Sequence, residues 1–139
     1  MRLRGSEFSV RLELRAGVSP SEDAEKVLKA MKNVVGDCEY QTGKESDSTL
    51  LLTSTSRRCL EKIRYQLRDR RVRGAARRLL LTRSEGESVS IMLNRQAAFQ
   101  GVIALCSRED ESPLGPVFLK LESDHLGTLT DWLTGHEVW

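Results

Sequence analysis

One stretch near the start of the chain limits the kind of sheet that this protein can build. In residues 7–15, "EFSVRLELR", polar and apolar side chains alternate at every position. Successive side chains of a strand point to opposite faces, so this segment predicts a strand with one buried and one solvated face. The buried face would consist of Phe8, Val10, Leu12 and Leu14.

A helix with a clear start follows this strand. Ser19 can act as its N-cap, Pro20 fits the first helical position, and Glu22 completes an S-x-x-E capping box. Beyond this start, apolar side chains recur with helical spacing on one face: Ala24, Val27, Leu28 and Met31. We therefore expect a helix that begins at Pro20 and packs this face on the sheet.

The second half of the chain adds further strands. A short strand at 47–55 is expected to pair with 38–42, and others are expected at 88–93, 99–105 and 117–123. A charged loop with proline and glycine spans 107–116, and a last helix, capped by Ser123 or Asp124, ends at Gly135. This order predicts a single α+β domain over residues 1–139, with a largely antiparallel sheet and helices packed on one face. At its ends, residues 1–6 and 136–139 are expected to be flexible.

The charge of the chain is distributed unevenly. Residues 57–78, "RRCLEKIRYQLRDRRVRGAARR", hold ten basic residues, nine of them arginine, against Glu61 and Asp69. This segment therefore carries +8, whereas the remaining 12 basic and 18 acidic residues sum to −6. Such asymmetry favours a side that faces a polyanion.

The arginine segment has the pattern of two amphipathic helices. Up to Arg71, Leu60, Ile63 and Leu67 form a core stripe, and the opposite face centres on Arg58, Lys62, Tyr65 and Asp69. Nearer the apolar edge, the long stems of three arginines can cover hydrophobic surface: Arg57, Arg64 and Arg71. Beyond Val72, Arg73 and Arg77 are expected opposite a second apolar face of Ala75, Ala76, Leu79 and Leu80. Gly74 marks a bend or a close helix contact, so two helical pieces are expected.

These features lead to a first hypothesis of RNA binding without catalysis. Arginine presents a planar fork of donors that matches phosphate oxygens, and an exposed tyrosine can stack on an unpaired base. The expected contacts are Arg58, Lys62, Arg68, Arg73 and Arg77, with Tyr65 as the stacking platform, on structured or single-stranded RNA. The alternatives are a merely solvated helix face and an assembly protein, homodimeric, whose basic face docks on a protein partner.

A second candidate contact lies between two expected strands, in "NRQAAFQG", residues 94–101. Asn94, Arg95 and Gln96 could present donors to phosphates or base edges. The residues favour the other interpretation, a structural one in which Asn94 caps a helical turn over residues 95–98 and Ala97, Ala98 and Phe99 belong to the core. For "SPLGP", residues 112–116, we expect a rigid turn, with a binding loop as the alternative.

The sequence gives little support to catalysis, to a cofactor or to a membrane location. His125 and His136 lack metal-ligand spacing, and the acidic run Glu109, Asp110 and Glu111 is more typical of a solvated loop than of a metal site. No stretch is apolar enough to span a membrane, and the N-terminus lacks the apolar region of a signal peptide. The three cysteines form no C-x-x-C pair and are odd in number, which predicts free thiols in the cytoplasm: Cys38, Cys59 and Cys106.

Several fragments together resemble an archaeal family of small proteins to which RNA binding is attributed. They are "RVRGAARRLLL", "LNRQAAFQG" and "ESPLGPV", supported by "SPSEDAEKV" and "ESDHLGTLTDWL", so the resemblance covers nearly the whole chain. It implies an α+β fold similar to that of the large-subunit ribosomal protein that binds 5S ribosomal RNA. It implies no catalytic residues, and fold likeness alone does not fix a function.

Overall fold

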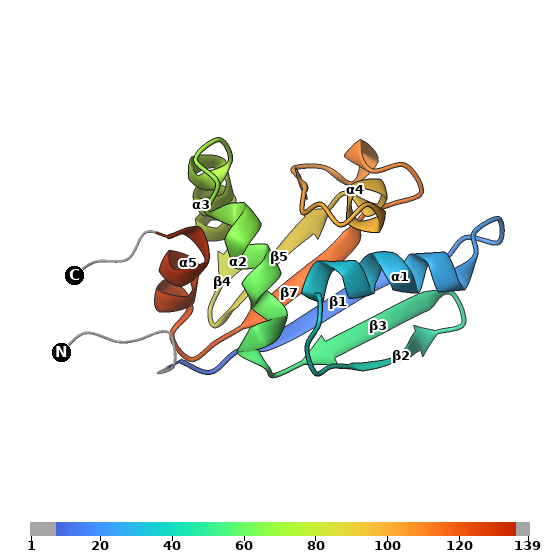
Figure 1. The fold of residues 1–139 in the computed structure, drawn as a ribbon, viewed down its shortest axis with the longest axis horizontal. Coiled ribbons are helices and arrows are strands. Elements are labelled where there is room, and N and C mark those ends of the chain that lie inside the picture. The colour runs from blue at the N-terminus through green and yellow to red at the C-terminus, as the bar shows by residue number, and fades with distance from the viewer. Residues whose placement is uncertain (1–7, 136–139) are drawn as a thin grey trace.

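A computed structural model describes residues 8–135, and its centre is an antiparallel sheet (Figure 1). The sheet has seven strands in the order β2-β3-β1-β7-β5-β4, and β6 pairs with β5 off this path. The strands are β1 (Arg11–Gly17), β2 (Gln41–Ser46), β3 (Thr49–Ser54), β4 (Ser84–Glu85), β5 (Ser88–Leu93), β6 (Leu105–Cys106) and β7 (Val117–Glu122). The predicted α+β class with a largely antiparallel sheet is therefore confirmed.

Alternation along the strands separates a buried from an open face. In β1 the buried positions are Leu12, Leu14 and Ala16, as the alternation predicts. Leu14 is opposite Leu52 of β3 and Leu119 of β7, so the buried rows of neighbouring strands are in register. Together these rows form the floor of the hydrophobic core.

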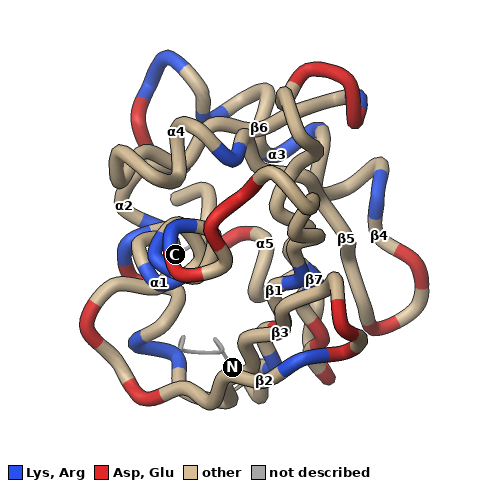
Figure 2. The backbone as a smooth tube through the Cα atoms, turned by 90° about the vertical axis from the view of Figure 1, so that its right-hand side faces the viewer, with Lys and Arg blue, Asp and Glu red and all other residues tan. Residues whose placement is uncertain are grey.

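The helices cover the buried face of this sheet. They are α1 (Ala24–Val35), α2 (Glu61–Leu67), α3 (Arg73–Thr82), α4 (Arg95–Phe99) and α5 (Leu126–Thr134), with short 3-10 turns η2 (Arg57–Leu60) and η3 (Glu109–Glu111). Figure 2, turned by 90° from Figure 1, shows that α1 and α2 lie on the same side of strands β1, β3 and β7. The arginine segment forms two helical pieces, as predicted, because η2 and α2 run together and a turn at residues 68–72 separates them from α3.

The start of α1 differs from the prediction. The helix begins at Ala24, with Asp23 as the N-cap whose side chain accepts from the N–H of Glu25. Glu22 does accept from the N–H of Ser19, at 2.9 Å, but this contact closes a turn ahead of the helix. The carboxylate of Glu22 is bound to Arg95 as well, and this tertiary contact holds the turn outside the helix.

Two further boundaries were predicted wrongly. Residues 99–105 do not form a strand: only Leu105 and Cys106 pair with β5. The side chain of Gln66 holds the preceding loop instead, since it donates to the Gly101 carbonyl and accepts from the Ile103 N–H. At α5 the N-cap is His125, because Asp124 accepts from Ser9 and Ser123 accepts from the N–H of His125. Gly135 ends this helix in a left-handed conformation, as predicted.

The cysteine prediction is also corrected. Cys38 and Cys59 form a disulfide, and their Cα atoms are 5.4 Å apart. The β2–β3 hairpin returns the chain between these two residues, which brings the end of α1 beside η2. Cys106 is a free and buried thiol, and burial raises its pKa.

Residues 1–6 and 136–139, for which flexibility is predicted, lie outside the described residues.

Candidate nucleic-acid interface

The η2–α2 segment buries one side and exposes the other, as the periodicity indicates. Leu60, Ile63 and Leu67 are at most 1% exposed. Tyr65 lies on the opposite side with 83% of its surface exposed, the largest exposure among the large hydrophobic residues of the described chain. Arg58 is also exposed. An aromatic ring in this position contributes nothing to the core and is free for an external contact.

Lys62 lies beside this exposed face but contacts the protein itself. Its ammonium donates to the carbonyl of Asn33 at 2.6 Å, near the end of α1. A positive charge at a helix C-terminus is favourable because the unpaired carbonyls there carry partial negative charge. The predicted phosphate contact at Lys62 therefore competes with a helix-capping role.

Three arginines gather around the end of α5 rather than on a common outer face. The Nε atom of Arg64 donates to the carbonyl of Trp132 at 2.9 Å. The guanidinium of Arg68 lies close to Gly135, where an added Cβ would be 2.8 Å from its Nε atom. Arg77 forms an ion pair with Asp131. Arg77 was expected to point away from the second apolar face, but it faces α5, and Ala75 of that predicted apolar face is exposed.

Arg57 covers hydrophobic surface, as its place at the apolar edge predicts. Its guanidinium lies 5.4 Å from the ring centroid of Phe8 and 5.7 Å from that of Trp132. Arg71, for which the same role was predicted, is instead exposed and pairs with Asp69 at 3.4 Å. It lies in the turn between the two helical pieces, where the helical periodicity no longer applies.

The cations that remain available are thus fewer than the segment contains. Among residues 8–135, no ion pair or hydrogen-bond acceptor engages the side chains of five exposed arginines: Arg58, Arg68, Arg70, Arg73 and Arg78. They lie on η2, on the turn at 68–72 and on α3. Together with Tyr65 we call them the arginine surface.

Arg95 is not a surface residue. Its side chain is 7% exposed and pairs with Glu22 at 2.9 Å, and it also donates to the carbonyls of Gly17 and Pro116. The prediction that Arg95 contacts phosphate is therefore replaced by a structural role. Burial of a charge costs desolvation free energy, and the pairing with Glu22 offsets this cost. Asn94 caps α4 by accepting from the Ala97 N–H, whereas Gln96 is exposed.

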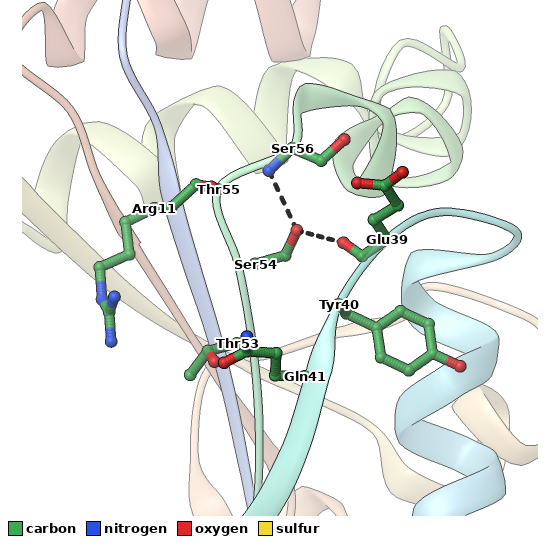
Figure 3. Close-up of a pocket in the computed structure, with 8 residues that line it drawn as sticks. All are labelled: Arg11, Glu39, Tyr40, Gln41, Thr53, Ser54, Thr55 and Ser56. Carbon is green, nitrogen blue, oxygen red and sulfur yellow. Dashed lines mark hydrogen bonds between the residues drawn. The ribbon is translucent and has the colours of Figure 1, made fainter.

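A hollow that sequence reasoning missed lies at the corner of the sheet (Figure 3). It encloses 360 Å³ between the first residue of β1, the start of β2 and the end of β3. Ser54 bonds to the carbonyl of Glu39 and to the N–H of Ser56, and Arg11 and Tyr40 lie on opposite sides of it. The run of hydroxyl residues at 53–56 is the sequence signal for it.

The open face of the sheet is chemically unlike the arginine surface. Arg15 pairs with Glu13, and Lys120 pairs with Glu122 at 3.5 Å. Across the strands Glu13 is opposite Lys120. Interspersed charges of both signs are typical of a solvated surface and give phosphate no net attraction. The arginine surface is therefore the better candidate for a nucleic acid.

Two other features of the described chain bear on function. Within residues 8–135 no group of three or more histidine, cysteine, aspartate or glutamate side chains could hold a metal ion. Asp110 of the acidic run pairs with Arg108 at 3.2 Å instead. No helix in the same range is long and apolar enough to cross a membrane.

Comparison with known proteins identifies relatives along almost the whole chain. A UPF0201 protein of Sulfurisphaera tokodaii is 37% identical over 126 residues, which cover 89% of this chain and 86% of the relative. One of Thermococcus kodakarensis is 35% identical, with 92% and 91% covered. The crystal structure of a UPF0201 protein from Methanococcus jannaschii superposes with a TM-score of 0.72 at 22% identity, covering 89% of this chain and 98% of that one, and so has the same fold. A family model described as RNA binding matches residues 11–122, and the chain therefore belongs to this family, together with its UPF0201 relatives.

Proposed function

We propose that this protein binds RNA through the arginine surface, without catalysing a reaction on it. The single observation that supports this most directly is the exposure of Tyr65, at 83%, on the same helical segment as an unpaired Arg58. The description of the matching family as RNA binding supports the same class of partner.

The chemistry of the surface fits RNA in two ways. Unpaired guanidinium groups bind phosphate with two parallel hydrogen bonds and keep their charge at any physiological pH. An exposed tyrosine ring stacks on an unpaired base, which contributes about 1–3 kcal/mol per base. Arg58, Arg68, Arg73 and Tyr65 keep their predicted roles in this proposal, whereas Lys62 and Arg77 act mainly on the ends of α1 and α5.

The test is fluorescence-anisotropy binding of the full chain to oligouridylate, a structured RNA hairpin and duplex DNA at two salt concentrations. The Arg58→Glu/Arg73→Glu variant is expected to weaken RNA binding at least about 10-fold and to flatten its salt dependence, because released counterions scale with phosphate contacts. Tyr65→Ala is expected to weaken binding to oligouridylate and to leave duplex binding nearly unchanged. Lys44→Glu, on the exposed edge strand β2, is the control for a charge reversal outside the arginine surface, and its effect is compared with that of Arg58→Glu alone.

The outcomes also separate RNA binding from an assembly role. Wild-type protein that binds no RNA at low salt, or variants that bind as the wild type does, would show that the arginine surface is not the binding face. Sedimentation should then reveal a dimer that Tyr65→Ala dissociates, if the surface instead contacts a second copy.

A further inference from the structure

A groove of 600 Å³ lies away from the arginine surface, between α1, α4 and the turn at residues 112–116. Its apolar part comes from Phe99 of α4 and from Pro113 and the exposed Leu114 of the turn, above the buried Val27 and Ala30 of α1. Two exposed amide side chains, Gln96 and Gln100, stand on its α4 side. The groove thus combines an apolar wall with amide groups that both donate and accept hydrogen bonds.

A row of lysines runs along α1 beside this groove. Lys26, Lys29 and Lys32 are all exposed, and within residues 8–135 none of them forms an ion pair. Lys26 lines the groove, and the ammonium of Lys29 is 5.2 Å from the centroid of the Phe99 ring. Spacing of three residues keeps the row on one side of the helix.

Two acidic residues, Glu22 and Asp23, line the groove itself at the start of α1, and both make contacts within the protein. The carboxylate of Glu22 is bound to Arg95, and Asp23 caps the helix. Glu25 lies in the first turn. The net charge beside the groove therefore becomes positive from Lys26 toward the end of α1, which favours an anionic chain over a neutral or basic one.

We propose that this groove receives an unpaired base of the bound RNA while the lysine row holds the adjoining phosphates. The inference rests on the proposed RNA binding and adds a second contact region, on α1 and α4. Phe99 and the neighbouring aliphatic side chains contact the flat face of the base, and Gln96 and Gln100 bond to its polar edge. Bases in a duplex are stacked and paired, so the groove selects single-stranded or looped RNA.

Two sets of variants separate the base contact from the phosphate contact. Gln96→Ala/Gln100→Ala is expected to weaken binding to an oligouridylate of about ten nucleotides by roughly 10-fold, while binding to an RNA duplex of about 16 base pairs stays unchanged. Lys26→Glu/Lys29→Glu is expected to weaken both and to reduce the salt slope by roughly 1.4 on the single strand and roughly 1.8 on the duplex, because two phosphate contacts are lost. Lys44→Glu again controls for charge, and thermal melts confirm that each variant is folded.

Crosslinking locates the base independently of affinity. Oligouridylate that contains 4-thiouridine, irradiated on the wild-type protein, is expected to attach to the peptides around Phe99 and α1 as well as to the arginine surface. Attachment only within residues 57–78, with wild-type affinity in the glutamine variant, would overturn the groove proposal and leave RNA binding standing. No RNA binding by the wild type would overturn both.

The anisotropy assay also tests whether the lysine row binds an acidic protein segment instead of RNA. If polyglutamate displaces oligouridylate as effectively as unlabelled oligouridylate does, the lysine row recognises negative charge alone and the proposed base contact is wrong. Weak displacement by polyglutamate is the expected result.

Discussion

Arg95 and Glu22 form a buried ion pair that joins α4 to the turn before α1. Their side chains are 7% and 10% exposed, and the guanidinium also bonds to two backbone carbonyls. Arg95→Met would leave the Glu22 carboxylate buried without its partner, which costs about 3–5 kcal/mol. Urea unfolding at neutral pH is the measurement. Glu22→Met/Arg95→Met should recover part of the loss; a double variant as unstable as Arg95→Met would contradict this account.

The same pair predicts how stability depends on pH. Burial alone would raise the pKa of Glu22, but hydrogen bonds from the Ser19 N–H and from Arg95 outweigh it, and the pKa lies below its ordinary value of 4.5. A lowered pKa in the folded state means that this stabilisation is complete above the ordinary value and is lost as the pH falls through the folded one. Unfolding free energies compared between pH 7 and about pH 3 should therefore fall more steeply for the wild type than for Glu22→Gln. Parallel pH profiles would exclude Glu22 as the cause.

Sequence reasoning could not assign Arg95. A short helical turn with a cap was predictable from Asn94 and confirmed, but the burial of Arg95 depends on Glu22, which lies 73 positions earlier in the chain. Periodicity reports which side of one element is apolar, not which distant carboxylate comes to lie beside it. For the same reason Tyr65 was predicted exposed and is exposed, whereas the partners of Lys62 and Arg77 were not foreseen.

At the scale of elements, the contact between α3 and α5 distinguishes structural from available arginines. Arg77 is paired with Asp131, while Arg73 has no such partner within residues 8–135. Arg77→Ala should therefore lower the unfolding free energy by about 0.5–1 kcal/mol, and Arg73→Ala by less than about 0.5 kcal/mol. Thermal melts at low and high salt test this, since the difference should shrink as salt screens the pair. Equal losses in both variants would argue against the pair as a stabilising contact.

The disulfide ties the edge hairpin to the start of the arginine segment. Cys38 and Cys59 are 21 positions apart, so the bond closes a loop that contains β2 and β3. A loop of this size corresponds to about 3 kcal/mol, through restriction of the unfolded chain. Dithiothreitol is therefore expected to lower the urea midpoint of the wild type, and Cys38→Ser/Cys59→Ser should not respond to it. Alkylation of the denatured, unreduced protein should modify one cysteine; modification of three would show that the bond is absent.

The elements themselves were largely predictable, and their ends were not. β1, β5 and β7 follow from alternation, and the arginine segment forms two helical pieces as predicted, but the break lies at residues 68–72 and Gly74, where the bend was predicted, is inside α3. The expected strand at 99–105 failed because Gln66 of α2 satisfies the backbone groups that a neighbouring strand would otherwise bond. Competition of this kind is decided by tertiary contacts, which a local pattern does not contain.

For the whole molecule, the strand order predicts a gradient of local stability. β1 and β7 each have a strand on both sides, whereas β2 is an edge strand with all six residues exposed. Amide hydrogen exchange should be slowest in β1 and β7 and fastest in β2 and β4, because local opening of an edge strand costs less free energy than opening of a central strand. Mass spectrometry of peptic fragments measures this order. Slow exchange in β2 would indicate that its free edge is covered, as it would be in a dimer.

The position of β1 also has a consequence for the synthesis of the chain. Among residues 8–135, β1 precedes every other strand, yet it pairs with β7, so that Leu14 can pair with Leu119 only after more than a hundred further residues have been synthesised. Until then one edge of β1 has no partner, and its apolar side cannot be enclosed. The sheet of a nascent chain on the ribosome therefore remains incomplete until β7 has emerged. Contacts between residues so distant in sequence also make folding slow. A protein with this topology depends on its C-terminal quarter to complete the sheet that its N-terminus begins.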